Sequence, residues 1–373
     1  MNLKKTAVAS AVGATLAISG VASGVAYADG HSVQLYGRVN NVINMKELDG
    51  DTIDLTTLTE SEIDEDSTNV STIGSRVGIK ASAPIDADTT AHARFEWSAS
   101  TDDETGAFGD TRIGEVGVTG NFGTVKVGNM WSTFYNMVGT HLDPTVTLGA
   151  VLYSTVADLP YRSSNTIQYS NSFGAVNISA EVRLSDEDDP DESGGKGDAE
   201  KLGAADGNAI GVSFNATENL LLAVAVDSSS DGDLDDPTTP LFEEDVDRDR
   251  TGFAAKWSQD NWWASLSIAM HDADGVVEYT QTQIHVGMDF GNGLSGFVGF
   301  GTVENDIDDD ISSDDPDDSE ATTINITKKI GNSGFRVYYE GVIASDVFTV
   351  DLEDDEASIY DHDQHLFGLR MDF

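Results

Sequence analysis

The chain of 373 residues is built from short segments in which apolar and polar residues alternate with a period of two. In the segment 32–45, for instance, Val33 and Leu35 alternate with Gln34 and Tyr36. Sixteen such segments can be counted, and no segment has the periodicity of an amphipathic helix. Because alternation of this kind marks strands with two chemically different faces, the sequence predicts an all-β fold.

The connections between these segments alternate between two classes. Seven are tight polar turns, such as Gly-Asn-Phe-Gly at 120–123, and eight are longer. Tight turns at one end and long loops at the other, on strands of about ten residues, are typical of outer-membrane barrels. We therefore predict a 16-stranded antiparallel transmembrane β-barrel. The long class contains the acidic runs, which we expect to be loops: 47–68, 101–110, 185–206, 228–249, 304–320 and 346–361.

Alternation alone fits a soluble barrel or sandwich equally well, because either face could be the outer one. The distribution of large aromatic residues favours the membrane barrel. Many of them lie at or beside the tight turns or the C-terminus, where an interfacial aromatic girdle belongs. These residues are Phe122, Phe173, Trp257, Trp262, Trp263, Phe290, Phe335 and Phe373.

The third long connection, which precedes Arg162, differs in composition from the others. It carries only two acids, Asp143 and Asp158, and is rich in aromatic and aliphatic residues. A loop this long and this apolar is expected to pack against protein rather than extend into water. We predict that it folds into the lumen of the barrel.

The first 28 residues read as a signal peptide. Lys4 and Lys5 precede an apolar run over 7–25, and Ala26-Tyr27-Ala28 is a small-x-small cleavage site. A membrane anchor is the alternative, but small residues dominate the run. We expect cleavage after Ala28, which leaves 29–373 as one barrel domain.

The net charge is −46, and the chain has no cysteine. A polyanion gains nothing from an acidic surface, so nucleic acid is excluded as a partner. Such acidity indicates either disorder or a salty environment that screens self-repulsion. The many alternating segments argue against disorder, so we predict a halophilic source.

Five stretches spread over the chain resemble the trimeric 16-stranded general porins of Gram-negative outer membranes, in the Neisseria- and Burkholderia-like branch. They are SVQLYGRVNN, GSRVGIKASAPI, RIGEVGVTGNFGTVKVGN, RSSNTIQYSNSFG and the terminal FGLRMDF. The resemblance implies a homotrimer in outer-membrane lipid and lipopolysaccharide, inserted by the barrel-assembly machinery, which reads an end similar to Phe373. It also implies passive diffusion of ions and small hydrophilic solutes, a constriction formed by the third loop, and no catalysis.

Basic residues on one face of the first seven strands are the candidate pore lining. We expect this basic wall to face the inserted loop, with Asp143 and Asp158 opposite as loop carboxylates. The alternative is that these bases only neutralise lumen acids such as Glu96, Glu115 and Glu181. The basic wall comprises Arg38, Arg76, Lys80, Arg94, Lys126, Arg162 and Arg183.

Other signals are weak. Asp227 to Gly232 resembles the start of an EF-hand loop, but the twelfth position is Thr238 rather than Glu. We expect no cofactor and no specific metal site, with diffuse binding of Ca²⁺ and other cations to the acidic loops. An adhesin or receptor barrel that uses those loops is the alternative function, and an outer-membrane enzyme is a further one for which no catalytic motif is found.

Overall fold

The computed structural model describes residues 25–28, 30–54, 57, 59–101, 108–142, 144–145, 161–184, 207–231, 246–273, 277–307, 318–351 and 356–373. Its first strand, β1 (Val25–Ala28), pairs with the start of β2. Because β1 lies within the predicted signal peptide, it belongs to the mature protein only if cleavage occurs before it.

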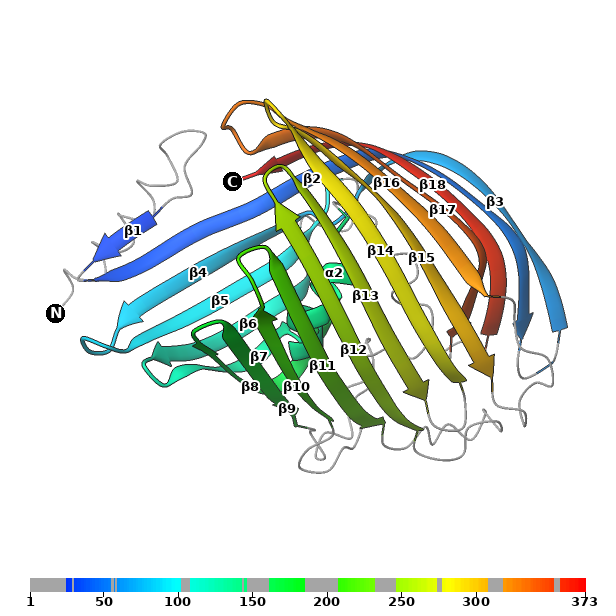
Figure 1. Ribbon diagram of the computed structural model, residues 1–373. Helices are drawn as coiled ribbons and strands as arrows, with labels where there is room; N and C mark the ends of the chain where they lie inside the picture. Colours follow the sequence, from blue (N-terminus) through cyan, green and yellow to red (C-terminus); the bar gives the residue numbers. More distant parts are fainter. Residues whose placement is uncertain are drawn as a thin grey trace.

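All strands belong to one antiparallel sheet that closes on itself through the pairing of β18 with β2 (Figure 1). Both β3 and β4 pair with β2, one after the other, so they share a single position in the ring. The ring therefore has sixteen positions, and the predicted barrel is confirmed. Its strands are β2 (His31–Asp54), β3 (Thr59–Thr72), β4 (Arg76–Pro84), β5 (Thr90–Ala99), β6 (Phe108–Gly120), β7 (Gly123–Trp131), β8 (Arg162–Phe173), β9 (Val176–Arg183), β10 (Gly207–Asn215), β11 (Leu220–Asp231), β12 (Val246–Gln259), β13 (Trp262–Ala273), β14 (Val277–Gly291), β15 (Leu294–Ile307), β16 (Ser319–Lys329), β17 (Phe335–Asp351) and β18 (Glu356–Asp372).

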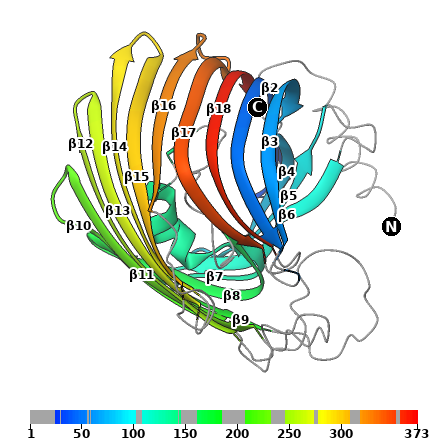
Figure 2. The ribbon, with the colours of Figure 1, turned by 90° about the vertical axis from the view of Figure 1, so that its right-hand side faces the viewer.

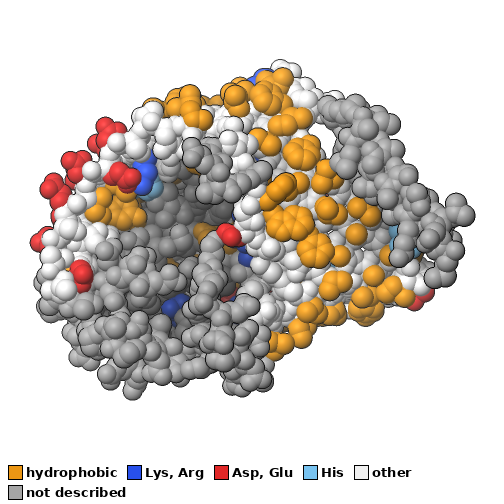
Figure 3. Space-filling view, turned by 180° about the vertical axis from the view of Figure 1, so that it is seen from behind, with side chains coloured by type: hydrophobic (Ala, Val, Ile, Leu, Met, Phe, Trp, Pro, Cys, Tyr) orange, Lys and Arg blue, Asp and Glu red, His pale blue; other side chains and the backbone are white. Residues whose placement is uncertain are grey.

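The outer face of the barrel is apolar and the inner face is polar. On β14, Ile284 and Val286 are 50% and 48% exposed, whereas the side chains between and beside them, Gln283 and His285, are buried. Figure 3 shows hydrophobic side chains spread over the outer wall. This inversion of a soluble protein excludes the soluble sandwich and matches a barrel surrounded by lipid. Among the described residues, no helix has the length and apolarity needed to cross a membrane.

Two of the predicted acidic loops are wrong, because the wall continues through them as strand. Within 47–68 the structure has β2 running to Asp54 and β3 starting at Thr59, and within 346–361 β17 runs to Asp351 and β18 starts at Glu356. Asp and Glu are poor strand formers. Pairing with neighbours that already belong to the wall overrides that preference here.

The prediction for Trp263, one of the eight aromatic residues assigned to the girdle, is also wrong, because its side chain lies on the inner face of the barrel. Its indole lies across Gly287 and tilts against Phe297, which is buried on the inner side of the sheet. The tight turn brings two successive tryptophans, Trp262 and Trp263, to the same rim, but alternation sends only Trp262 outward.

The third long connection leaves β7 and turns back at once into the barrel. It forms a π-helical turn, η1 (Tyr135–Gly139), and a short α-helical turn, α2 (Thr140–Leu142), which lie inside the ring of strands (Figure 2). The described start of the loop therefore lies in the lumen, as its apolar composition predicts.

Candidate pore lining

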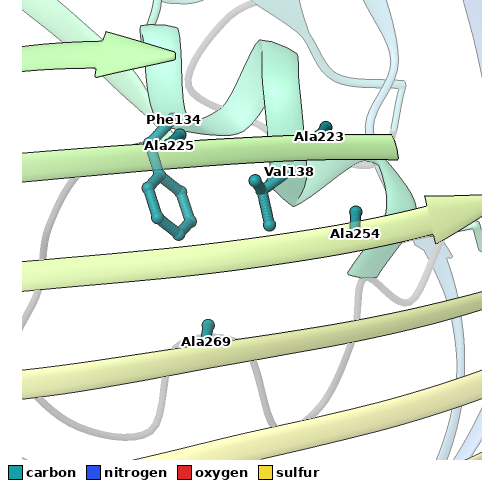
Figure 4. Close-up of a cluster of buried hydrophobic side chains, with 6 residues drawn as sticks. All are labelled: Phe134, Val138, Ala223, Ala225, Ala254 and Ala269. Carbon is teal, nitrogen blue, oxygen red and sulfur yellow. The ribbon is translucent and has the colours of Figure 1, made fainter. Parts of the chain in front are cut away.

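The start of the third loop is packed onto the inner wall formed by β10–β13. Phe134 and Val138 are completely buried there (Figure 4). The wall beneath them is made of alanines, and this is what allows a helical turn to lie flat on a sheet. The alanines are Ala223, Ala225, Ala254 and Ala269.

Two glycines in the same wall bring the loop even closer. A Cβ atom at Gly252 would lie 2.5 Å from Cζ of Phe134, and one at Gly211 would lie 2.6 Å from Cγ of Met137. Both distances are too short for real Cβ atoms, so the loop occupies space that only glycine leaves free. These glycines of β10 and β12 therefore help to determine where the loop lies.

A buried carboxylate, Glu181 on β9, fixes the point where the loop leaves the wall. It accepts hydrogen bonds from the backbone N–H of Thr133 at 2.6 Å, from Oγ of Ser163 at 3.0 Å and from Nε2 of Gln168 at 3.0 Å. Arg183 pairs with it at 3.2 Å. Every oxygen of this carboxylate is therefore used to hold the loop base and the adjoining strands together.

Arg183 also links Glu181 to a second buried acid, Asp227 on β11, at 2.5 Å. Asp227 pairs in addition with Arg250 at 3.1 Å, and the guanidinium of Arg250 lies 3.8 Å from the ring centroid of Phe134. We call these four residues, Glu181, Arg183, Asp227 and Arg250, the loop anchor. Since Asp227 is committed to two arginines, it is not free to start an EF-hand site. Across the residues that the structure describes, no three acidic or histidine side chains group as metal ligands.

A second network surrounds Glu96 on β5, whose side chain is only 1% exposed. Arg94 pairs with it at 2.7 Å, Arg112 at 3.1 Å and Arg76 at 3.8 Å. The hydroxyl of Tyr36 donates to the same carboxylate at 2.9 Å and accepts from Nε of Arg94. In this Glu96 cluster, three guanidinium groups share one carboxylate, which leaves a local excess of positive charge.

Arg162 lies beside the Glu96 cluster but does not join its ion pairs. Its guanidinium is 5.4 Å from the ring centroid of Trp131, and it is electrostatically coupled to Arg112, to Glu96 and to Arg76. The described residues supply no salt bridge to Arg162.

The remaining predicted bases are also on the inner face. Arg38 pairs at 3.2 Å with Asp372, which it shares with Arg336 and Arg370. Lys80 lies 4.7 Å from the centroid of Tyr36, and Lys126 pairs at 3.1 Å with Glu115.

The structure thus brings most of the basic wall together on one arc and separates Arg183, which belongs to the loop anchor. Among the inward arginines that sequence reasoning missed are Arg112, Arg250, Arg336 and Arg370. Arg112 sits at a β-bulge, where Glu96 pairs with Ile113 and Trp97 with Thr111. A bulge re-aims a side chain and breaks the alternation that assigned the faces. The other three could have been identified by applying the same alternation of inward and outward residues to the later strands.

The Glu96 cluster and the docked loop start face one another across the lumen. The Glu96 cluster lies on β2, β4, β5 and β6, whereas the loop start lies on β10–β13. In the sixteen-position ring β5 and β13 are eight positions apart, which is half the circumference. Asp143 and Asp158 lie outside the described residues.

His141 is a titratable group in the docked start of the loop. Burial lowers the pKa of His141 from 6.5 to about 4, and the nearby charge of Lys256 acts in the same direction. His141 is therefore neutral at neutral pH.

Comparison with known proteins agrees with this architecture. A sequence model of the family described as Gram-negative porin matches residues 11–369. No curated protein shows a significant match to the chain.

Three solved structures show the same fold at low identity. Outer-membrane expressed OmpT of Vibrio cholerae has a TM-score of 0.68 and 14% identity, covering 94% of this chain and 100% of that one. The trimer form of in-vitro folded OmpT from the same organism has a TM-score of 0.65 and 15% identity, covering 92% and 100%. Salmonella typhi OmpF in complex with daunomycin has a TM-score of 0.66 and 14% identity, covering 94% and 100%. With its lipid-facing barrel, polar lumen and nearly full-length family match, the chain belongs to the Gram-negative porin family, whose members are outer-membrane channels.

Proposed function

We propose that the protein is a passive diffusion channel for ions and small hydrophilic solutes, and that its third loop forms the constriction. The observation that carries this proposal is the placement of the loop start on β10–β13, of which β13 lies half a circumference away from β5, the strand of Glu96. A loop fixed on one side and an excess of guanidinium groups on the other narrow the passage and set up a transverse field. Such a field orients dipolar solutes and water as they pass.

The basic wall is proposed to line this passage rather than only to neutralise acids. The ion-pair pattern supports this, because Arg76, Arg94 and Arg112 outnumber the one carboxylate that they share. Asp143 and Asp158 are proposed as the loop carboxylates that face them. The channel catalyses no reaction in this proposal and carries no cofactor.

The assembly is proposed to be a homotrimer in outer-membrane lipid and lipopolysaccharide, delivered by a signal peptide over residues 1–28 and inserted by the barrel-assembly machinery. The solved trimer form of OmpT, which shares the fold, supports the trimer. The acidic outer strands and loops are proposed to collect Ca²⁺ and other cations diffusely at the entrance, which fits a halophilic source.

Planar-bilayer recording of the purified protein in a salt gradient tests the proposal. We expect stepwise conductance in groups of three and a reversal potential that changes when Arg76 is replaced by Ala. A correctly folded, heat-modifiable protein that conducts no ions would overturn the channel and favour the adhesin or receptor barrel. Unchanged conductance and selectivity in Arg76→Ala would remove the basic wall from the mechanism while leaving the channel intact.

A further inference from the structure

An aromatic column stands at the base of the third loop. Trp131 ends β7 and lies directly opposite Arg162, which begins β8. Tyr135 stacks on Trp131 with ring centroids 4.5 Å apart and an interplanar angle of 19°, and Tyr161 meets Tyr135 edge-on at 5.4 Å. The guanidinium of Arg162 lies over the indole, so it forms the end of the column.

Hydrogen bonds to the backbone of Trp131 and Ser132 hold the aromatic column in place. The backbone carbonyl of Trp131 accepts hydrogen bonds from Nδ2 of Asn136 at 3.0 Å and from Nε2 of Gln168 at 3.1 Å. Next along the chain, the N–H of Ser132 donates to the carbonyl of Tyr161 at 3.0 Å. The indole therefore starts from a fixed backbone and has a fixed neighbour on one side.

Arg162 differs from its neighbours in what holds it. Arg76, Arg94 and Arg112 are all held by the carboxylate of Glu96, which also cancels part of their charge. An aromatic face, by contrast, attracts a guanidinium through its quadrupole without carrying any charge of its own. A cation held in this way is positioned without a direct ion pair to the group that holds it.

We propose that Trp131 is a specificity-determining positioning residue. Its indole, backed by Tyr135, holds Arg162 in the lumen beside Arg76 and Arg112 as a cation that forms no salt bridge with a carboxylate of the described residues. Without the indole the guanidinium is free to turn toward Glu96 or toward the loop, and its contribution to anion passage falls. This inference rests on the proposed channel function, and it adds to the basic wall an uncharged residue that controls selectivity.

The test is the reversal potential of single variants in a KCl gradient. It is measured on the purified protein in the oligomeric state that it adopts. Arg162→Gln is expected to lower the ratio of anion to cation permeability by a factor of roughly two, the size expected for one screened charge near the passage. Trp131→Leu is expected to shift the ratio in the same direction by a smaller factor. Trp131→Phe, which keeps a ring face, is expected to restore most of the wild-type ratio.

Two further measurements separate positioning from simple damage. In the double variant Trp131→Leu with Arg162→Gln, the ratio should equal that of Arg162→Gln alone, because the indole acts only through the arginine. Trp97→Leu is the matched control: Trp97 stacks on the outward-facing Phe95, so it should leave the ratio unchanged.

The outcomes distinguish the two levels of the argument. If the wild type conducts nothing, the channel itself fails. If it conducts and Arg162→Gln shifts the ratio but Trp131→Leu does not, or if Trp131→Leu shifts it equally with and without Arg162, the positioning role is overturned.

Discussion

Glu181 holds the base of the third loop in place. Its carboxylate receives the Thr133 N–H, the Ser163 hydroxyl and the Gln168 amide while it pairs with Arg183. In Glu181→Gln, one oxygen becomes an NH₂ group that faces donors and has nothing to donate to. We expect this to weaken docking of the loop start by about 1–3 kcal/mol, the cost of leaving buried polar groups unpaired.

Single-channel recording checks this expectation through an increase in closing events and current noise. Glu115→Gln is the matched control, because Glu115 pairs only with Lys126 among the described residues and does not contact the loop. Quiet wild-type currents in Glu181→Gln would show that the alanine and glycine surface alone holds the loop.

A substitution at Gly252 tests directly whether the alanine and glycine surface holds the loop. A Cβ at this position would lie 2.5 Å from the ring of Phe134, so Gly252→Ala forces the phenylalanine and its turn away from the wall. Overpacking of this kind costs about 1–3 kcal/mol, here of loop docking. We expect an altered unit conductance that a second change, Phe134→Leu, partly reverses by removing the clashing ring. A conductance that is unaltered in Gly252→Ala, or equally altered with and without Phe134→Leu, would contradict the packing argument.

The residues that hold the loop could not be identified from the sequence, although the loop itself could. An inward glycine or alanine looks the same in the alternation whether it faces water or a docked helix, and Glu181 reads as one more lumen acid. Arg112 was missed for a different reason, since the bulge beside it changes the phase of β6. Period two identifies faces but not which partners meet on them.

The outer ends of β2, β3 and β18 form an acidic strip that the sequence predicted as a loop. On its outward face Asp49 pairs across with Asp64 and Asp361, and Glu47 pairs across with Asp66 and Asp363. Figure 3 shows acidic side chains gathered along one rim. Like charges directly opposite one another destabilise strand pairing, and salt weakens that repulsion.

We therefore expect the acidic strip to be strand at high salt and frayed at low salt. Amide hydrogen exchange should show protection of residues 47–51 at about 1 M KCl that is largely lost at about 10 mM, where the Debye length is ~30 Å. Residues 36–43, lower on the same strand β2, serve as the internal control and should stay protected throughout. Asp49→Lys should restore protection at low salt, and equal protection of the wild-type strip at both salt concentrations would count against the argument.

The docked loop has a pH dependence of its own through His141. Its pKa in the folded loop, about 4, lies below the ordinary value of 6.5. A depressed folded pKa means that the undocked loop binds the proton more readily, so docking is at full strength above pH 6.5 and weakens as the pH falls toward 4. We expect channel closing events to become more frequent over this window, and to lose most of that dependence in His141→Asn. An unchanged pH profile in His141→Asn would assign the effect to other groups.

Taken as a whole, the barrel combines a chain of net charge −46 with a positively charged arc inside it. The two fields differ in range. The acids of the acidic strip are exposed at the rim, so salt screens them strongly. The arginines of the Glu96 cluster and Arg162 are largely buried inside the barrel, so salt screens them much less. The selectivity of the channel should therefore depend on absolute salt concentration, with cations favoured at about 50 mM and the balance moving toward anions at about 1 M. Reversal potentials measured at one fixed gradient ratio and several absolute KCl concentrations give this salt dependence directly.

Arg162→Gln should reduce the shift of the permeability ratio at the high-salt end. Lys328→Gln, which removes a lysine beside the turn at Asn292, should leave that shift unchanged. A permeability ratio that is independent of salt would mean that a single charged ring governs passage, and the opposition between rim and arc would have to be abandoned.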